Sequence, residues 1–139
     1  METHYPIDLV IFLLGTNDLQ NSYNRSVQEV GMGMRQLIKT VHESDKGPMM
    51  TAPKVLIISP TTIINIPNLY PQFKGEGVEK SKALAKIYQN ISLEENCEFL
   101  DAASFIESSQ VDGFHLDESA CLILGQAVYQ KVMQIFLEN

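Results

Sequence analysis

The sequence predicts an α/β fold in which parallel strands alternate with helices. Two observations carry this expectation. Three short apolar runs have the near-continuous hydrophobicity of strands that are buried on both faces, and each is followed by a longer segment with helical spacing. Strands joined in this way by right-handed helical crossovers form a layered sandwich around a parallel sheet. The length of 139 residues suits one domain with one core, residues 1–139.

The first strand and helix are predicted between residues 7 and 44. Residues 7–14 form an apolar run between a proline and a glycine, which is typical of a buried strand. The spacing of apolar residues then predicts a helix over about 24–44. Ser26 and Glu29 have the spacing of a capping box, which places the start of that helix near Ser26.

The same alternation continues to the end of the chain. Residues 55–58 predict a second buried strand, and residues 75–95 carry a helical pattern. Residues 97–100 predict a third, short strand that ends at Asp101. A last helix follows, and Asp117 is its predicted N-cap.

Charge and cysteine content exclude several classes of function. Ten Lys and Arg against 17 Asp and Glu give a net charge of −7, the wrong sign for binding nucleic acid or anionic lipid. Cys97 and Cys121 have neither the spacing of a zinc site nor that of a disulfide framework, so we expect two free thiols. The longest apolar run, residues 9–14, falls far short of the ~20 residues of a membrane span. We therefore expect a cytoplasmic protein without nucleic-acid or membrane partners.

Polar residues follow the predicted strands at the edge of the sheet where ligands bind in such folds. Asn17 comes after the first strand and offers a neutral NH₂ donor to a developing oxyanion. Asp112 precedes His115 by three residues, with Gly113 between them, so the carboxylate can accept a hydrogen bond from Nδ1 and leave Nε2 free as a base. Taken singly, each cluster is more typical of local structure than of a site: His115 of a loop histidine, and Asn17 with Asp18 of a turn.

Together, Gly15-Thr16-Asn17-Asp18 and Asp112-Gly113-Phe114-His115 resemble the motifs of the SGNH hydrolase family, the GDSL esterases and lipases. The arylesterase and acyltransferase branch is the most similar, and the resemblance covers nearly the whole chain. It implies a flavodoxin-like three-layer sandwich, of which this chain would hold three strands and three main helices. It also implies Asn17 as an oxyanion-hole donor, His115 as general base, Asp112 as its orienting partner, a small-molecule ester substrate, and neither metal nor organic cofactor.

The sequence also departs from that family. The family's nucleophilic serine lies in a Gly-Asp-Ser motif near its N-terminus, and a later glycine amide gives a second oxyanion donor; neither has a counterpart here. Ser59 matches a family position that is not the nucleophile, and Pro60 lacks the amide that an oxyanion donor needs. Two interpretations remain: an esterase whose serine comes from an upstream segment or another chain, and an inactive remnant that acts as a binding or oligomerising module.

In the strand order that the resemblance implies, the absent first strand would lie beside residues 7–14. This long apolar strand would then form an open edge, which soluble monomers rarely leave exposed. We expect the edge to be covered, most simply in a homo-oligomer whose copies pair their first strands antiparallel. A separate polypeptide or an upstream segment would cover it equally well.

The loop over residues 61–74 is too apolar for an ordinary solvated loop. It carries four large side chains that are candidates for lining an acyl or aryl pocket, namely Ile64, Ile66, Tyr70 and Phe73. The alternative is that they pack against the sheet or against a neighbouring subunit.

Overall fold

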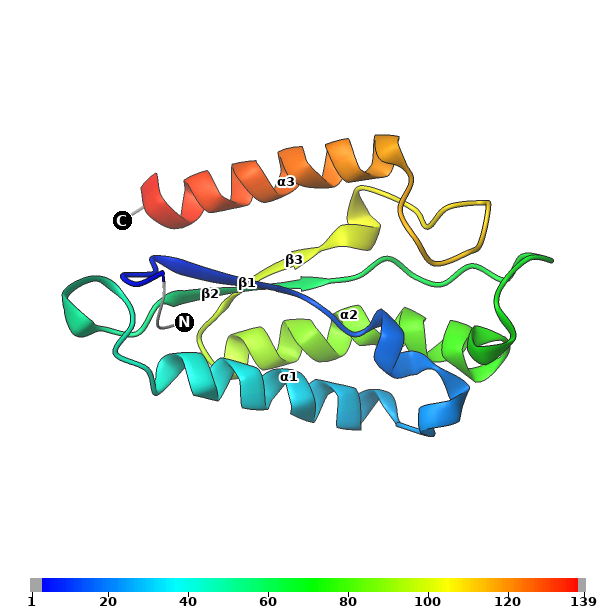
Figure 1. Ribbon diagram of the computed structural model, residues 1–139, viewed down its shortest axis with the longest axis horizontal. Coiled ribbons are helices and arrows are strands. Elements are labelled where there is room, and N and C mark those ends of the chain that lie inside the picture. The colour runs from blue at the N-terminus through cyan, green and yellow to red at the C-terminus, as the bar shows by residue number, and fades with distance from the viewer. Residues whose placement is uncertain (1–3, 138–139) are drawn as a thin grey trace.

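The computed structural model describes residues 4–137 as three layers with a parallel sheet in the middle (Figure 1). The strands are β1 (Leu9–Leu13), β2 (Lys54–Ser59) and β3 (Glu98–Asp101), in the order β1-β2-β3. Val10 pairs with Val55 in the first ladder. The predicted α/β sandwich is therefore confirmed, with strand boundaries within two residues of those expected.

Helices cover both faces of the sheet. In Figure 1, α1 (Val27–His42) and α2 (Glu76–Glu94) lie on one side of it and α3 (Glu118–Leu137) lies on the other. This arrangement places an apolar cluster on each face of the central strand, and Leu56 and Ile57 of β2 are fully buried between them. Burial on both faces explains why residues 55–58 of β2 are all branched aliphatic residues.

The predicted helix starts are confirmed. The Ser26 hydroxyl accepts a hydrogen bond from the Glu29 amide at 3.2 Å, and the Glu29 carboxylate accepts one from the Ser26 amide at 2.7 Å, which completes the capping box of α1. Asp117 accepts a hydrogen bond from the Ala120 amide at 2.8 Å and so caps α3. The N-cap of the last helix therefore lies two residues after His115, which ties the start of α3 to the candidate site.

β1 lies at one edge of the described sheet. The Lys54 amide donates to the Asp8 carbonyl at 3.0 Å, so in the parallel ladder the backbone groups of alternate residues, beginning with Leu9, point away from β2. Ile11 and Leu13 also have exposed side chains, and no strand among residues 4–137 covers this side. Pairing of this edge with a second copy or another segment stays a prediction.

Hydrogen exchange tests that prediction. If β1 pairs with another strand, the outward-pointing amides of Leu9, Ile11 and Leu13 exchange slowly, and an Ile11→Lys variant exchanges them at least ~10-fold faster because an edge lysine blocks strand pairing. A monomer of 15.6 kDa whose three amides already exchange rapidly would contradict the prediction.

α3 also bears on the expectation that the chain has no membrane partner, which stays a prediction. By length and composition alone this helix is long and apolar enough to cross a membrane, although the longest unbroken apolar run, residues 9–14, is not. A few polar residues interrupt α3, so an unbroken apolar run does not reveal it. In the folded chain Leu124, Ala127 and Ile135 are buried against the sheet, as in the core helix of a layered domain.

Candidate active site

Asp112 and His115 form a hydrogen-bonded pair in the loop before α3. Asp112 Oδ2 lies 2.7 Å from His115 Nδ1, and the carboxylate's other oxygen accepts from the amides of Phe114 and His115 at 3.1 and 3.0 Å. The Asp112 side chain is only 20% exposed, while that of His115 is 66% exposed. The carboxylate thus fixes the ring through Nδ1 and leaves Nε2 available to solvent or to a substrate.

A close backbone approach holds this loop in place. Gly113 has a φ of +87°, and its carbonyl accepts a hydrogen bond from the Ile64 amide at 2.9 Å. A Cβ at this position would come within 2.7 Å of the Ile64 carbonyl oxygen. The turn that brings Asp112 onto His115 therefore requires glycine, both for the backbone angle and for the space.

Buried hydroxyls connect the same loop to the end of β2. Ser108 donates to the Thr62 carbonyl at 2.8 Å, and its oxygen lies 2.8 Å from that of Thr61. The Ser109 amide donates to the His115 carbonyl at 2.8 Å. The role of Ser108 was not predictable from the sequence, because no local pattern relates positions 46 or 47 residues apart.

Asn17 lies in a helical turn, Thr16–Leu19, directly after β1. The chain enters this turn through Gly15, whose φ is +123° and whose Cβ, if present, would lie 2.7 Å from the Tyr88 hydroxyl oxygen. That hydroxyl donates a hydrogen bond to the Leu14 carbonyl at 3.2 Å, so Tyr88 of α2 holds the backbone just before the turn. Burial first, and the Asp18 carboxylate second, raise the pKa of Tyr88, so it remains a neutral donor.

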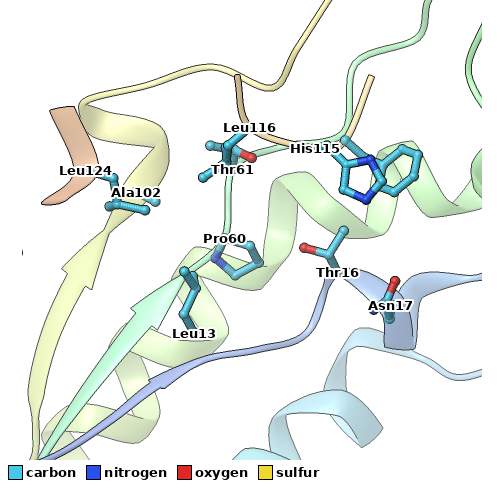
Figure 2. A pocket seen from close by; sticks show the side chains of 10 residues that line it. Leu13, Thr16, Asn17, Pro60, Thr61, Ala102, His115, Leu116 and Leu124 are labelled. Carbon is cyan, nitrogen blue, oxygen red and sulfur yellow. The ribbon is translucent and has the colours of Figure 1, made fainter. Parts of the chain in front are cut away.

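Asn17 and His115 line one cavity of about 190 Å³ at the carboxyl ends of the strands. In Figure 2, His115, Thr16 and Asn17 lie at one end of the cavity, and Ala102 and Leu124 lie at the other. The remaining lining residues are mostly apolar: Leu13, Pro60, Thr61, Phe114 and Leu116. Two polar clusters that are nearly a hundred residues apart thus face the same small hollow.

The four loop side chains predicted to contact substrate are not among the residues that line this cavity. Phe73 is buried, and its ring lies 4.7 Å from that of Phe114, while the Tyr70 ring lies 5.2 Å from Phe114. Phe114 in turn contacts the His115 ring at 4.0 Å between centroids and does line the cavity. Tyr70 and Phe73 therefore support the wall behind His115, and Ile66 lies near Gly113. Contact of these residues or of Ile64 with a substrate stays a prediction.

No serine is among the described residues that line the cavity. Ser59 is nearest in the topology, at the end of β2, but its side chain is fully buried and its hydroxyl donates to Asp101 at 2.8 Å. A nucleophile must be able to reach the substrate and give its proton to the base. Ser59 does neither, which agrees with the sequence-based interpretation of this residue.

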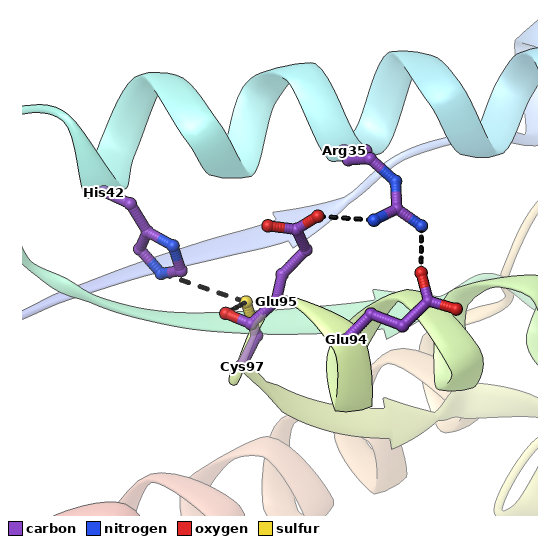
Figure 3. A network of polar contacts seen from close by, with 5 residues as sticks. All are labelled: Arg35, His42, Glu94, Glu95 and Cys97. Atoms are coloured by element: carbon purple, nitrogen blue, oxygen red, sulfur yellow. Dashed lines mark hydrogen bonds and ion pairs between the residues drawn. The ribbon is translucent and has the colours of Figure 1, made fainter.

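A second imidazole lies near a sulfur on the opposite side of the sheet from α3. Figure 3 shows His42 facing Cys97, beside ion pairs that join Arg35 of α1 to Glu94 of α2 and to Glu95, the C-cap of that helix. His42 Nε2 lies 4.0 Å from Cys97 Sγ. Burial, with smaller contributions from Glu95 and Glu98, raises the pKa of Cys97 to about 11. The thiol stays protonated at neutral pH, so this contact is no activated nucleophile. Cys97 and Cys121 are both free thiols, as expected.

The pKa of Asp112 gives a testable pH dependence. Partial burial opposes its ionisation, but the hydrogen bonds from His115 and Phe114 outweigh burial and lower the pKa below its ordinary value of ~3.9. The ionised carboxylate therefore stabilises the fold fully above about pH 4, and this contribution is lost as the pH falls through the lowered value. In urea unfolding, Asp112→Asn should be less stable than the wild type at pH 6, and the difference should shrink by pH 3. A difference that stays constant over that range would contradict this assignment.

Comparison with known proteins places this arrangement in a family. A model of the GDSL-like lipase/acylhydrolase family matches residues 2–120. The chain therefore belongs to the GDSL-like lipase/acylhydrolase family. Comparison with curated protein sequences gives no match.

Solved structures agree with this membership. The chain is similar to the aryl esterase of M. smegmatis, with 35% identity and a TM-score of 0.85 over 95% of this chain and 63% of that one. It is also similar to Est24, a carbohydrate acetylesterase from Sinorhizobium meliloti, with 35% identity and a TM-score of 0.88 over 96% of this chain and 64% of that one. The chain thus spans slightly less than two thirds of the length of these structures.

Proposed function

We propose that this chain provides the base, its orienting carboxylate and one oxyanion donor of a serine-type esterase that acts on small acyl esters, and that the serine comes from outside these 139 residues. The observation that carries the proposal is the Asp112–His115 pair at 2.7 Å, at the rim of a cavity that Asn17 also lines. An ionised carboxylate on Nδ1 and a free Nε2 are what a general base needs.

In the proposed reaction the serine hydroxyl attacks the ester carbonyl, and Nε2 of His115 takes its proton. The negative charge that develops on the carbonyl oxygen accepts a hydrogen bond from the side-chain NH₂ of Asn17. His115 then gives the proton to the departing alcohol and activates a water molecule, which releases the acid and restores the serine. Asp112 stabilises the imidazolium that forms in both steps.

The size of the cavity favours a short acyl group. Its volume of about 190 Å³ lies below the ~300–1,000 Å³ of pockets for drug-sized ligands, and its wall away from His115 is apolar. Est24, to which the chain is similar, is described as a carbohydrate acetylesterase. We therefore infer that acetyl and similarly small esters are the substrates. We also infer that Tyr70 and Phe73 influence the shape of the site indirectly, because they position the Phe114 ring.

A second candidate function is a catalytically inactive binding or oligomerising module. It is favoured by one observation, the lack of a serine among the described residues that line the cavity. In that case Asp112 and His115 form a structural turn only.

A fusion separates the two candidates. The N-terminal third of Est24, which this chain does not match, is joined to the chain, and the fusion and the chain alone are treated with a fluorophosphonate and assayed with p-nitrophenyl acetate. We expect labelling of one serine and hydrolysis in the fusion, and neither in the chain alone. A folded fusion that is not labelled would overturn the esterase proposal and favour the inactive module, while serine labelling of the chain alone would overturn the external origin of the nucleophile.

A further inference from the structure

The face of α3 that points away from the sheet is apolar. Its stripe consists of Leu122, Tyr129, Met133 and Phe136, which follow one another at helical spacings of seven, four and three residues. They are 66, 64, 38 and 43% exposed, respectively, so the stripe lies opposite the residues that α3 buries against the sheet. We call these four residues the outer face of α3. A helix that is apolar on both sides has a second surface to cover.

We propose that the outer face of α3 binds the same face of a second copy of this chain, with the two helices antiparallel. This inference is independent of the proposed function, since the outer face contains no residue of the candidate site. In Figure 1, α3 forms an outer layer of its own, which leaves room for a helix to lie along it.

The residues of the outer face complement themselves in the antiparallel arrangement. With the two-fold axis at Tyr129, Leu122 of one copy meets Phe136 of the other, and Gly125 meets Met133. A Cβ at Gly125 would have nothing within 4 Å, so this glycine leaves an open notch into which a methionine can pack. Gly125 thus makes room for Met133 on each side of the axis. Leu122 packs against Phe136, and the two Tyr129 side chains meet at the axis. Helices that pack through such side chains lie ~8–10 Å apart.

The area and the charge of the face also suit a second copy. With about 200 Å² for a fully exposed large side chain, the four residues expose roughly 400 Å². Exposed Ile123 and Leu137 and the glutamines at 126 and 130 enlarge the surface toward the ~800 Å² that each partner gives to a stable interface. The only charges on α3 are Glu118 and Lys131, and Lys131 pairs with Glu98 at 2.6 Å. Two chains of net charge −7 thus meet at a surface that carries few charges.

The charges and contacts of α3 also argue against binding of its outer face to a membrane. Helices that lie on membranes carry Lys and Arg on their polar face, and α3 has a single lysine, which is held by Glu98. Crossing a membrane would require α3 to leave the sheet. Leu124 and Ile135 are buried there, and Lys54 donates a hydrogen bond to the Ile135 carbonyl at 2.8 Å.

Sedimentation of variants tests the proposal. The measurement uses an Ile11→Lys background, in which the edge of the sheet is blocked, so that α3 is the remaining interface. We expect twice the mass of 15.6 kDa in this background and a monomer after addition of Tyr129→Glu. The matched control is Leu93→Glu on α2, another exposed apolar residue, which should leave the dimer intact. A monomeric Ile11→Lys background, or a dimer that survives Tyr129→Glu, would overturn the proposal.

Cysteine cross-linking tests the antiparallel register. Leu122→Cys and Phe136→Cys are made separately in a Cys121→Ser background and mixed. We expect the mixture to form a disulfide-linked dimer on oxidation, at least ~10-fold faster than either variant alone, because only the mixture brings the two thiols together at one point. Equal rates in all three samples would overturn the register. Binding of the unmodified chain to neutral phosphatidylcholine vesicles, abolished by Tyr129→Glu, would overturn the proposal in favour of a membrane surface.

Discussion

Replacing His115 by alanine lowers kcat/KM for p-nitrophenyl acetate by about 10³-fold or more in the fusion that restores a serine, since general-base catalysis typically contributes ~10²–10⁴-fold. The reason is local. His115 is the one titratable side chain among the described residues that line the cavity, so no neighbouring group there can take over as base. The substitution removes an exposed side chain, so the free energy of unfolding should fall only by the ~0.5–1.5 kcal/mol typical of one hydrogen bond, here that to Asp112.

The matched control for this variant is His42→Ala. His42 is also an imidazole at the surface, but it faces Cys97 near the far ends of α1 and α2 rather than the cavity (Figure 3). Its removal should leave kcat/KM within about twofold of the parent fusion. If His115→Ala retained most of the activity, the assignment of the base would be wrong, even though the fold and the family would stand.

Gly113→Ala is the substitution with the largest expected effect on stability. It places a Cβ 2.7 Å from the Ile64 carbonyl oxygen at a residue whose φ is +87°. Backbone strain of this kind costs about 1–3 kcal/mol. Rotation of a side chain cannot relieve the close contact, because the contacting atom belongs to the backbone of Ile64. We expect a loss of about 2–3 kcal/mol in urea unfolding, together with a lower kcat in the fusion because the loop that carries His115 must shift.

Substitutions at two other glycines separate the two causes of this loss of stability, the backbone angle and the close contact with Ile64. Gly75 has a φ of +73° but nothing within 4 Å of an added Cβ, so Gly75→Ala should cost about 1–2 kcal/mol from the backbone angle alone. Gly33 lies inside α1 with open space around it, and Gly33→Ala should stabilise the helix by ~0.5–1 kcal/mol. If Gly113→Ala were no more costly than Gly75→Ala, the close approach to Ile64 would not constrain the loop.

The layered fold was predictable because its signals are local. The aliphatic run of β2 indicates burial on both faces, and Ser26 and Asp117 mark helix starts through contacts three residues away. The hydrogen bond of the Asp112–His115 pair was likewise predicted from local spacing and the intervening glycine, although the same spacing also occurs in ordinary loops. Asn17 could be placed near this pair because parallel strands deliver their following loops to one edge of the sheet.

What the sequence did not predict depends on contacts between distant segments. Leu124 lines the cavity only because of the way α3 crosses the sheet, and Ser108 holds the loop through Thr61 and Thr62. Phe73 has the same apolar character as a pocket residue, but its ring is turned into the core beside Phe114. Side-chain direction in a loop follows from tertiary packing, which apolar composition alone does not specify.

The convergence of Asn17, Asp112 and His115 on one reacting centre is tested most directly by a crystal structure of the fusion after reaction with a small alkyl fluorophosphonate. We predict a phosphonylated serine in the cavity, with a phosphonyl oxygen within ~3 Å of the Asn17 side-chain nitrogen, His115 Nε2 facing the serine oxygen, and the Asp112–His115 hydrogen bond retained. A phosphonyl group that points away from Asn17, or an imidazole that has left Asp112, would contradict the account.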